Sequence, residues 1–275
     1  MILSQTYQLL ESRQPGLTDH LHIADVRIGV HLTAILLSDG SMGIASTGME
    51  SRTPGKKINR YFGDLSPGKI TGCRVSELFE KEVEHQALSC LRLAALNAIS
   101  STLISRGGYK VIENKDPIEL IDLSGKKTIT LVGAFQSYIR KIMPTSNKLQ
   151  VLELNQEALT GDQQAFYIPA AQYREALSVS DVVIITGYTL VNGTMDNLLE
   201  AVAEDTVVVV VGPSGNLLPD VLFANKVSII GATRITHQQE LFRVVEQGGS
   251  GFHLFEYCAQ KICIINNHQQ HQVAG

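Results

Sequence analysis

Hydrophobic residues change their spacing about halfway along the chain, and this change predicts two structural units. In the second half, short β-branched runs such as Val182–Thr186 and Val207–Val211 end in turns of glycine and small polar residues. Helix-like segments separate these runs. Strands that alternate with helices at short spacing are typical of a doubly wound parallel sheet. We therefore expect residues 113–275 to form a Rossmann-like α/β domain.

The first half has a different pattern. The apolar stretch Val26–Leu37, the turn Ser38-Asp39-Gly40 and the stretch Met42–Ser46 predict a β-hairpin. From Ser76 to Ser105 the spacing is helical, and its second part is apolar nearly all round, as in a buried helix. We expect residues 1–112 to form a small α+β domain.

The turns after the predicted strands hold the candidate binding residues. Carboxyl ends of parallel strands meet at one edge of a sheet, and ligands bind beyond that edge. Glycine lets a backbone approach a ligand, and Asn and Ser side chains supply neutral hydrogen bonds. The alternative is that the polar side chains only cap helices. The candidates are Gly133, Thr186, Gly187, Asn192, Gly212, Pro213 and Ser214.

A long polar stretch from Gly48 to Arg74 is the next candidate, because a loop of this length is usually functional or mobile. It carries six basic and two acidic residues in a chain whose net charge is −4. One hypothesis is a lid that brings cations to an anionic ligand, with Glu50 and Arg52 nearest. The alternative is an ordinary solvated loop.

A dinucleotide site is disfavoured by the turn after the first strand of the second half. Glu153 lies 20 residues after Gly133, the spacing of a ribose-binding acid. However, the turn lacks the second and third glycines of G-x-G-x-x-G, and Phe135 would crowd a pyrophosphate. NAD or a nucleoside-bearing ligand such as S-adenosylmethionine stays as the alternative.

The cysteines do not form a metal-binding motif. Soft-metal sites need clustered Cys and His residues. We therefore predict no metal site built from the chain's own side chains, although a metal could arrive complexed by a small organic ligand. The four cysteines are scattered and contain no C-x-x-C pair: Cys73, Cys90, Cys258 and Cys263.

Composition sets wider limits. The net charge of −4 argues against nucleic-acid binding. We see no secretory signal and no apolar run that approaches the ~20 residues of a membrane helix. We therefore expect a cytoplasmic protein with reduced thiols and no membrane partner. Assembly into a homo-oligomer is left open.

Together, these features resemble the putative heavy-metal chelation family. That resemblance implies an enolase-N-terminal-like domain followed by a Rossmann-like domain, with a cleft between them, and it carries no enolase active site. The matching residues are Leu131–Gly133, Ser180–Gly187, Thr189, Asn192, Val211–Ser214 and Gly231, together with Met42–Ala45 and Ala94–Ala98 in the first half.

The sequence thus leaves two functions open. One is a protein that binds a small anionic or metal-complexing molecule in the cleft, in heavy-metal chelation or handling. The other is an enzyme that acts on a nucleotide-like ligand there. No nucleophile motif, P-loop or H-E-x-x-H occurs, so the sequence identifies neither catalytic residues nor a cofactor.

Overall fold

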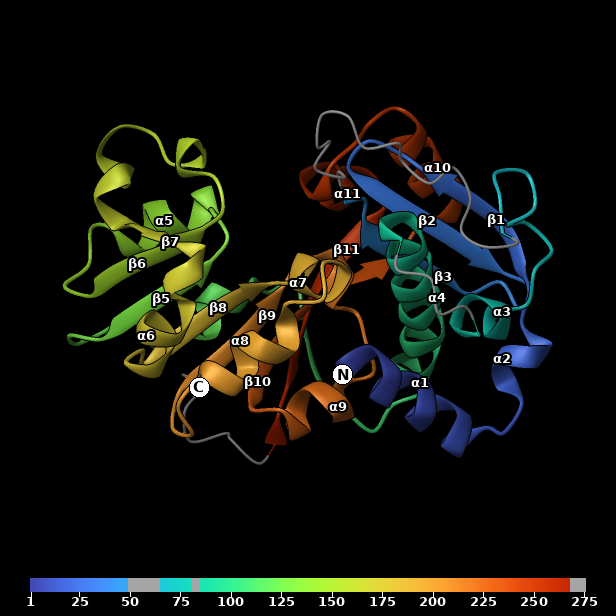
Figure 1. The fold of residues 1–275 in the computed structure, drawn as a ribbon, viewed down its shortest axis with the longest axis horizontal. Helices are drawn as coiled ribbons and strands as arrows, with labels where there is room; N and C mark the ends of the chain where they lie inside the picture. The colour runs from blue at the N-terminus through green and yellow to red at the C-terminus, as the bar shows by residue number, and fades with distance from the viewer. Residues whose placement is uncertain (49–64, 81–84, 268–275) are drawn as a thin grey trace.

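The computed structural model describes residues 1–48, 65–80 and 85–267. It contains a three-stranded antiparallel sheet and an eight-stranded, mostly parallel sheet, each with its own helices (Figure 1). The expected fold class, a small α+β unit followed by a Rossmann-like parallel sheet, is confirmed.

The small sheet and its helices come first in the chain. Its strands pair in the order β1-β2-β3, and each pair is antiparallel. The elements are α1 (Ile2–Arg13), α2 (Leu17–His20), β1 (Ile23–Ile28), β2 (Leu32–Leu37), β3 (Met42–Ser46), α3 (Val75–Phe79) and α4 (Gln86–Ser105).

One part of the hairpin prediction was wrong. The stretch Val26–Leu37 is not a single strand, because the chain reverses between β1 and β2. The backbone N–H of Gly29 donates to the carbonyl of Leu32 at 2.8 Å and closes this turn. The pattern hid the turn because Val30 is apolar, although its side chain is 61% exposed.

The large sheet has the strand order β4-β11-β10-β9-β8-β5-β6-β7. Its strands are β4 (Lys110–Glu113), β5 (Thr128–Val132), β6 (Lys148–Glu153), β7 (Tyr167–Pro169), β8 (Val182–Thr186), β9 (Val207–Val211), β10 (Val227–Ile235) and β11 (Ala259–Ile265). The intervening helices are α5 (Gln136–Ile142), α6 (Tyr173–Ser178), α7 (Tyr188–Val191), α8 (Met195–Ala201), α9 (Pro219–Ala224), α10 (Gln238–Glu246) and α11 (Gly251–Tyr257).

Six neighbouring strands, from β7 to β10, are parallel and follow the Rossmann order 3-2-1-4-5-6. The direction of winding reverses between β5 and β8, which is the topological switch point. Beyond β10 the sheet continues with β11, which is antiparallel to both of its neighbours, and ends with β4. The strand order therefore places the switch point away from the β4 edge.

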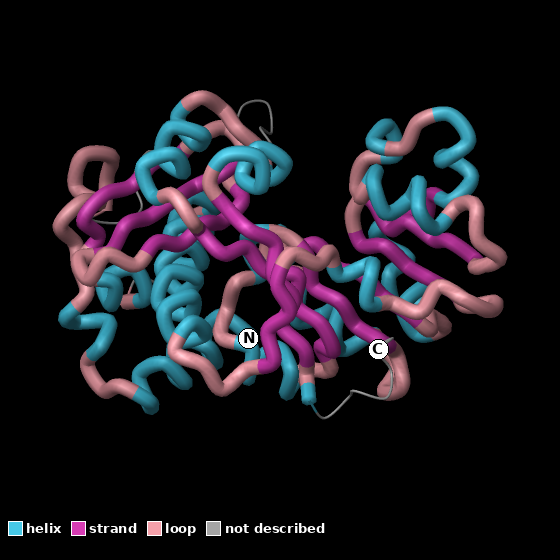
Figure 2. Tube along the Cα trace, turned by 180° about the vertical axis from the view of Figure 1, so that it is seen from behind, coloured by secondary structure: helices cyan, strands magenta, loops and turns pink. Residues whose placement is uncertain are grey.

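Helices cover both faces of the large sheet. The last two helices, α10 and α11, pack against the small sheet instead. The core beside α5 includes Ile139 and Ile142, whereas the core on the opposite face includes Leu177 and Leu222 of α6 and α9. Helices α10 and α11 share a separate core with β2 and β3. Figure 2 shows, from behind, how strands of the large sheet reach the helices that cover the small sheet.

The small sheet lies against α4 at backbone contact distance. A Cβ atom added to Gly43 of β3 would lie 1.9 Å from the carbonyl oxygen of Ala94 and 2.4 Å from the nitrogen of Ala98. Only glycine fits such an approach.

Among the described residues, α4 is the one helix long and apolar enough to cross a membrane by length and composition. That contradicts the expectation of no such segment, but 67% of its apolar window is buried, as in a core helix.

A polar contact joins the small sheet and α4 to the turn after β9. The Nδ2 atom of buried Asn97 donates to the carbonyl of Ile44 at 2.7 Å and to that of Ser214 at 3.1 Å. The backbone N–H of Ser46 donates to the Ser214 hydroxyl oxygen at 2.8 Å. We call this set of contacts the Asn97–Ser214 link; it fixes one edge of the large sheet to the small one.

The expected division into residues 1–112 and 113–275 falls inside β4, which pairs with β11 in the large sheet. The packing of α10 and α11 on the small sheet also crosses that division. The division into two domains at residues 112 and 113 stays a prediction.

The Gly43 contact gives a direct test of this packing. Gly43→Ala should lower the free energy of unfolding by about 3 kcal/mol, because the added methyl must displace the backbone of α4. Urea denaturation measures the change. Gly251→Ala is the matched control, since its Cβ would meet only a Pro213 carbon at 3.9 Å. If the Gly43→Ala and Gly251→Ala variants were equally stable, the close contact between β3 and α4 would not limit the size of residue 43.

Candidate functional site

A cavity of about 410 Å³ lies at the switch point, beyond the carboxyl ends of β5, β6 and β8. We call it the switch-point cavity. This is the position at which open α/β sheets bind ligands. Its lining residues are Val132, Gly133, Leu152, Glu153, Leu154, Ala170, Ala171, Tyr173, Thr186, Tyr188, Thr189, Asn192, Thr194, Asn197 and Leu198.

Three neighbouring strand ends form the floor of this cavity. Gly133 follows β5 with a φ of +107°, a conformation that suits glycine, and its backbone N–H donates to the carbonyl of Leu152 at 2.9 Å. Glu153 ends β6, and Thr186 ends β8. The strand order therefore gathers residues that lie far apart in the sequence.

Glu153 gives the described part of the cavity its charge. Its carboxylate accepts the backbone N–H of Ala134 at 2.9 Å and that of Leu154 at 2.7 Å. Ala134 follows Gly133 in the turn that precedes α5, where a dinucleotide fold binds pyrophosphate. A carboxylate already occupies this donor, and the lining residues include no Lys or Arg. Both features disfavour a phosphate at this position.

Asn192 and Thr186 each cap local backbone, as the alternative interpretation predicted. The Oδ1 atom of Asn192 accepts the N–H of Thr194 at 3.2 Å and its hydroxyl at 2.7 Å. The Thr186 hydroxyl oxygen accepts the N–H of Tyr188 at 3.3 Å. Within the described part of the chain, the Asn192 side chain bonds only through Oδ1, so its Nδ2 group can donate to a bound molecule.

Tyr188 connects the cavity to the small-sheet unit. The Nε2 atom of Gln86, the first residue of α4, donates to the Tyr188 hydroxyl at 3.0 Å. Gln86 in turn lies against Gly48, where an added Cβ would be 1.6 Å from the same Nε2 atom. The chain segment that precedes Glu50 and Arg52 therefore approaches this wall of the cavity.

The structure brings together some of the predicted site residues and separates others. Gly133, Thr186 and Asn192 line the switch-point cavity. Glu50 and Arg52 lie outside the described residues. The remaining four predicted residues, which do not line this cavity, are Gly187, Gly212, Pro213 and Ser214.

The separated residues belong to the contact between β8, β9 and the small sheet. An added Cβ on Gly187 would lie 2.7 Å from the nitrogen of Gly215, so glycine permits the two turns to touch. The Ser214 side chain is 1% exposed and bonds to Ser46. Ser214 therefore contributes to the Asn97–Ser214 link and does not line the cavity beside Asn192, and ligand binding by the predicted residues stays a prediction.

Several lining residues carried no distinctive signal in the sequence. Tyr173 follows a short 3-10 segment, and Asn197 lies in α8, where neither residue type marks a site by itself. Their position beside the cavity depends on how α6 and α8 cross the strand ends. Sequence spacing alone does not give that crossing.

The basic stretch from Gly48 to Arg74 is described at Gly48 and from residue 65 onward. Within that part, the Arg74 side chain lies 3.1 Å from the Glu77 carboxylate and 3.8 Å from that of Asp19. Its charge is thus balanced locally. The hypothesis that this stretch supplies cations to a ligand depends on residues outside the described part of the chain.

The four cysteines are free, buried and distributed over three separate cores. Cys73 and Cys90 lie in the largest core, Cys263 in the core beside α5, and Cys258 in the core shared by α10 and α11. Burial raises the pKa of Cys263 to about 12 and those of Cys73 and Cys258 to about 11. No group of three or more metal-ligating side chains occurs in residues 1–48, 65–80 and 85–267.

The chain matches two models that carry the same family description. A family model described as putative heavy-metal chelation matches residues 116–264, more than half of the 275 residues. A second model of the same description matches residues 11–100. No protein of curated function matches the chain.

Two solved structures share the fold along nearly the whole chain. A DUF364-family protein of unknown function from Pyrococcus horikoshii is 21% identical, with a TM-score of 0.73, over 96% of this chain and 100% of that one. Another from Desulfitobacterium hafniense is 17% identical, with a TM-score of 0.69, over 96% and 99%. At these identities the likeness shows the fold alone.

The raised pKa values predict how stability depends on pH. A thiol with a pKa near 12 in the fold and near 9 in the unfolded chain stabilises the fold below pH 9. That contribution decreases as the pH rises from about 9 to 12. Denaturant unfolding at pH 8 and pH 10 should show a smaller loss of stability for Cys263→Ala than for the wild-type chain. Equal losses of stability in the two proteins would show that the fold does not raise the pKa of the Cys263 thiol.

The distribution of cysteines also predicts metal content. Purified protein dialysed against a mild chelator should retain no stoichiometric zinc, nickel or copper, because one metal ion cannot reach thiolates in three cores. Elemental analysis measures this. Stoichiometric metal that disappears in the Cys258→Ser, Cys263→Ser double variant would contradict the prediction.

Proposed function

Because this chain belongs to the putative heavy-metal chelation family, we propose that it binds a small organic molecule in the switch-point cavity. The observation that supports this most strongly is the position of a 410 Å³ cavity at the reversal of strand order. A cavity of this size is within the range of small-molecule sites. Any role in metal handling then operates through the bound molecule.

The chemistry of the lining favours a ligand without phosphate. Apolar side chains such as Leu152 and Leu198 and the rings of Tyr173 and Tyr188 form most of the wall. Glu153, at the end of the second strand in Rossmann order, stands where such folds bind ribose hydroxyls. We therefore propose a nucleoside-type ligand that is neutral or cationic, of which S-adenosylmethionine is an example.

An anionic ligand is less well supported. Glu153 would repel a negative group, and no cation lines the described wall. The six basic residues of the Gly48–Arg74 stretch could supply the missing charge only through residues outside the described part. For the same reason, a metal complex that carries a net negative charge fits this wall poorly.

The hydrogen bonds that Glu153 already accepts favour binding over catalysis. It is the one carboxylate on the described wall, and its oxygens already accept the N–H groups of Ala134, Leu154 and Asn155. Such a carboxylate is held in place and suits recognition of hydroxyl groups. The other described lining groups that can exchange a proton are the hydroxyls of Tyr173 and Tyr188, and the Tyr188 hydroxyl already accepts a hydrogen bond from Gln86.

The free cysteines support the cytoplasm as the proposed location. All four are unpaired and buried in the fold. Proteins that retain unpaired cysteines are typical of reducing compartments, in which disulfides are rare.

Titration calorimetry with known nucleosides tests this proposal. Adenosine or S-adenosylmethionine should bind, whereas NAD, which carries a pyrophosphate, should bind at least about tenfold more weakly. Glu153→Gln should weaken S-adenosylmethionine binding by about tenfold, because a charged acceptor for its hydroxyls is lost. Absence of binding by both nucleosides, or a preference for NAD, would contradict the proposal.

Two further variants separate ligand binding from local structure. Asn192→Asp keeps the acceptor for Thr194 but removes the Nδ2 donor, so affinity should decrease about fivefold, or ~1 kcal/mol. Glu157→Gln removes an exposed carboxylate that does not line the cavity and should leave affinity unchanged. If Glu157→Gln weakens binding as much as Glu153→Gln, the effect is one of overall charge.

A further inference from the structure

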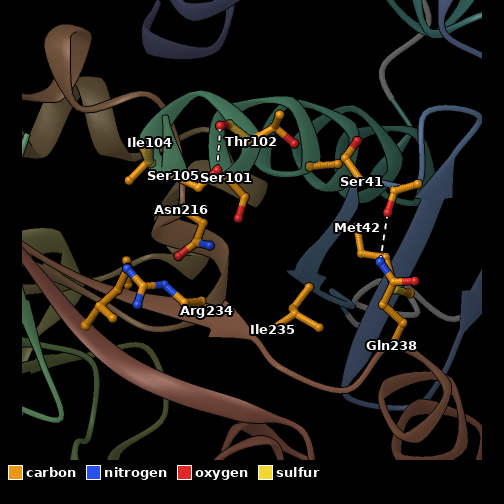
Figure 3. Close-up of a pocket in the computed structure, with 14 residues that line it drawn as sticks. Ser41, Met42, Ser101, Thr102, Ile104, Ser105, Asn216, Arg234, Ile235 and Gln238 are labelled. Atoms are coloured by element: carbon orange, nitrogen blue, oxygen red, sulfur yellow. Dashed lines mark hydrogen bonds between the residues drawn. The ribbon is translucent and has the colours of Figure 1, made fainter. Parts of the chain in front are cut away.

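A second cavity, of about 330 Å³, lies between α4 and the end of β10 (Figure 3). We call it the α4–β10 cavity. It shares no lining residue with the switch-point cavity. Its wall includes residues from the β2–β3 turn, α4, β10, β11 and the start of α10, so it joins the small-sheet unit to the large sheet.

Hydroxyl groups of α4 form one wall of this cavity. Ser101 and Thr102 both line it, and neither hydroxyl has a hydrogen-bond partner among the described residues. Helical Ser and Thr hydroxyls often bond to a preceding carbonyl, as the Ser105 hydroxyl does to Thr102 at 2.7 Å. Figure 3 shows Ser101 near Asn216, across from Arg234. The free hydroxyls can therefore bond to a molecule in the cavity.

Among the described residues that line the cavity, Arg234 is the charged one. Its side chain is 35% exposed, and its Nη1 atom pairs with Glu113 of β4. No other bond of its guanidinium occurs within the described residues, so Nε and Nη2 remain as donors. A guanidinium with two free donors matches the geometry of a carboxylate.

The remaining walls limit the chemistry further. Both polar atoms of the Asn216 amide already bond to the backbone of Thr233. Its Nδ2 atom donates to the Thr233 carbonyl, and its Oδ1 atom accepts the Thr233 N–H, at 2.6 Å each. Gln238 donates through Nε2 to the carbonyl of Gly40 at 2.8 Å, which leaves its Oε1 atom as an acceptor. Met42, Ile104, Ile235 and Ile262 supply apolar surface.

We propose that the α4–β10 cavity is a second ligand site and binds a small hydroxycarboxylic acid. The carboxylate lies on Arg234, and the ligand's hydroxyl bonds to Ser101 or Thr102. A single cation with neutral partners suits one carboxylate better than a phosphate dianion, and the lining lacks the His, Cys and acidic residues that a bare metal ion needs. A ligand here contacts both α4 and β10 and stabilises their packing.

Glu113 holds the Nη1 atom of Arg234, and its negative charge repels a carboxylate bound at Nε and Nη2, so removing Arg234 and removing Glu113 should change the affinity in opposite directions. Titration calorimetry uses L-malate and citrate as probes, with succinate to remove the hydroxyl and glycerol to remove the carboxylate. Malate or citrate should bind with a dissociation constant of about 1 mM or tighter. Succinate should bind more weakly, and glycerol should not bind.

The variants are at exposed or partly exposed side chains, so that the fold is kept. Arg234→Gln should weaken binding at least about tenfold, and Glu113→Gln should strengthen it because the negative charge beside the bound carboxylate is removed. Thr102→Val keeps the side-chain shape and should weaken binding of malate but not of succinate. The matched control is Arg243→Gln, which removes an equal charge from an exposed pair with Glu240.

Three outcomes would overturn the proposal. They are no binding of malate or citrate at 10 mM by the wild-type chain (about tenfold above the expected constant), equal weakening by Arg234→Gln and Arg243→Gln, and weaker binding by Glu113→Gln. None of these results depends on the switch-point cavity, because the two sites share no residue.

Discussion

The backbone contact between α4 and β3 is the constraint on which the rest of the structure depends. Gly43 allows the small sheet to reach the helix, and Asn97, from the same helix, bonds both to β3 and to the turn after β9. A buried amide that satisfies carbonyls from two sheets is costly to replace, because either carbonyl would otherwise be unpaired. Through these contacts one helix positions both sheets, and the packing of α10 and α11 on the small sheet adds a second connection.

In this arrangement the two cavities lie at different parts of the large sheet. The switch-point cavity uses β5, β6 and β8, and among the described residues Gln86 of the small-sheet unit bonds to Tyr188 in its wall. The α4–β10 cavity uses the opposite end of the sheet, where α4 itself is a wall. One carries a carboxylate, and the other carries a guanidinium. Such opposite charges suit two different ligands.

The family description mentions heavy-metal chelation, and the buried cysteines bear on how such a role could operate. Thiols that keep their protons and lie in three cores are poor ligands, since metal binding requires the thiolate. A bound organic molecule could supply the ligand atoms instead. We therefore look for the chemistry of this protein in its cavities and not in its cysteines.

Much of the fold was predictable from sequence because buried parallel strands are continuous apolar runs. Val182–Thr186 and Val207–Val211 were predicted with the bounds that the structure has. Strand order was not predictable, because it depends on which strands pair over long sequence distances. For that reason Gly133, Thr186 and Asn192 were correctly grouped at one edge, whereas Ser214, after β9, instead meets the small sheet.

Native mass spectrometry of protein purified without chelator tests the central claim, that the switch-point cavity holds a small organic molecule. We predict a retained mass that is released on denaturation, contains no phosphate, and is reduced in the Glu153→Gln variant. Retention of a metal ion alone, or of a phosphate-bearing nucleotide that the Glu153→Gln variant keeps, would contradict the account.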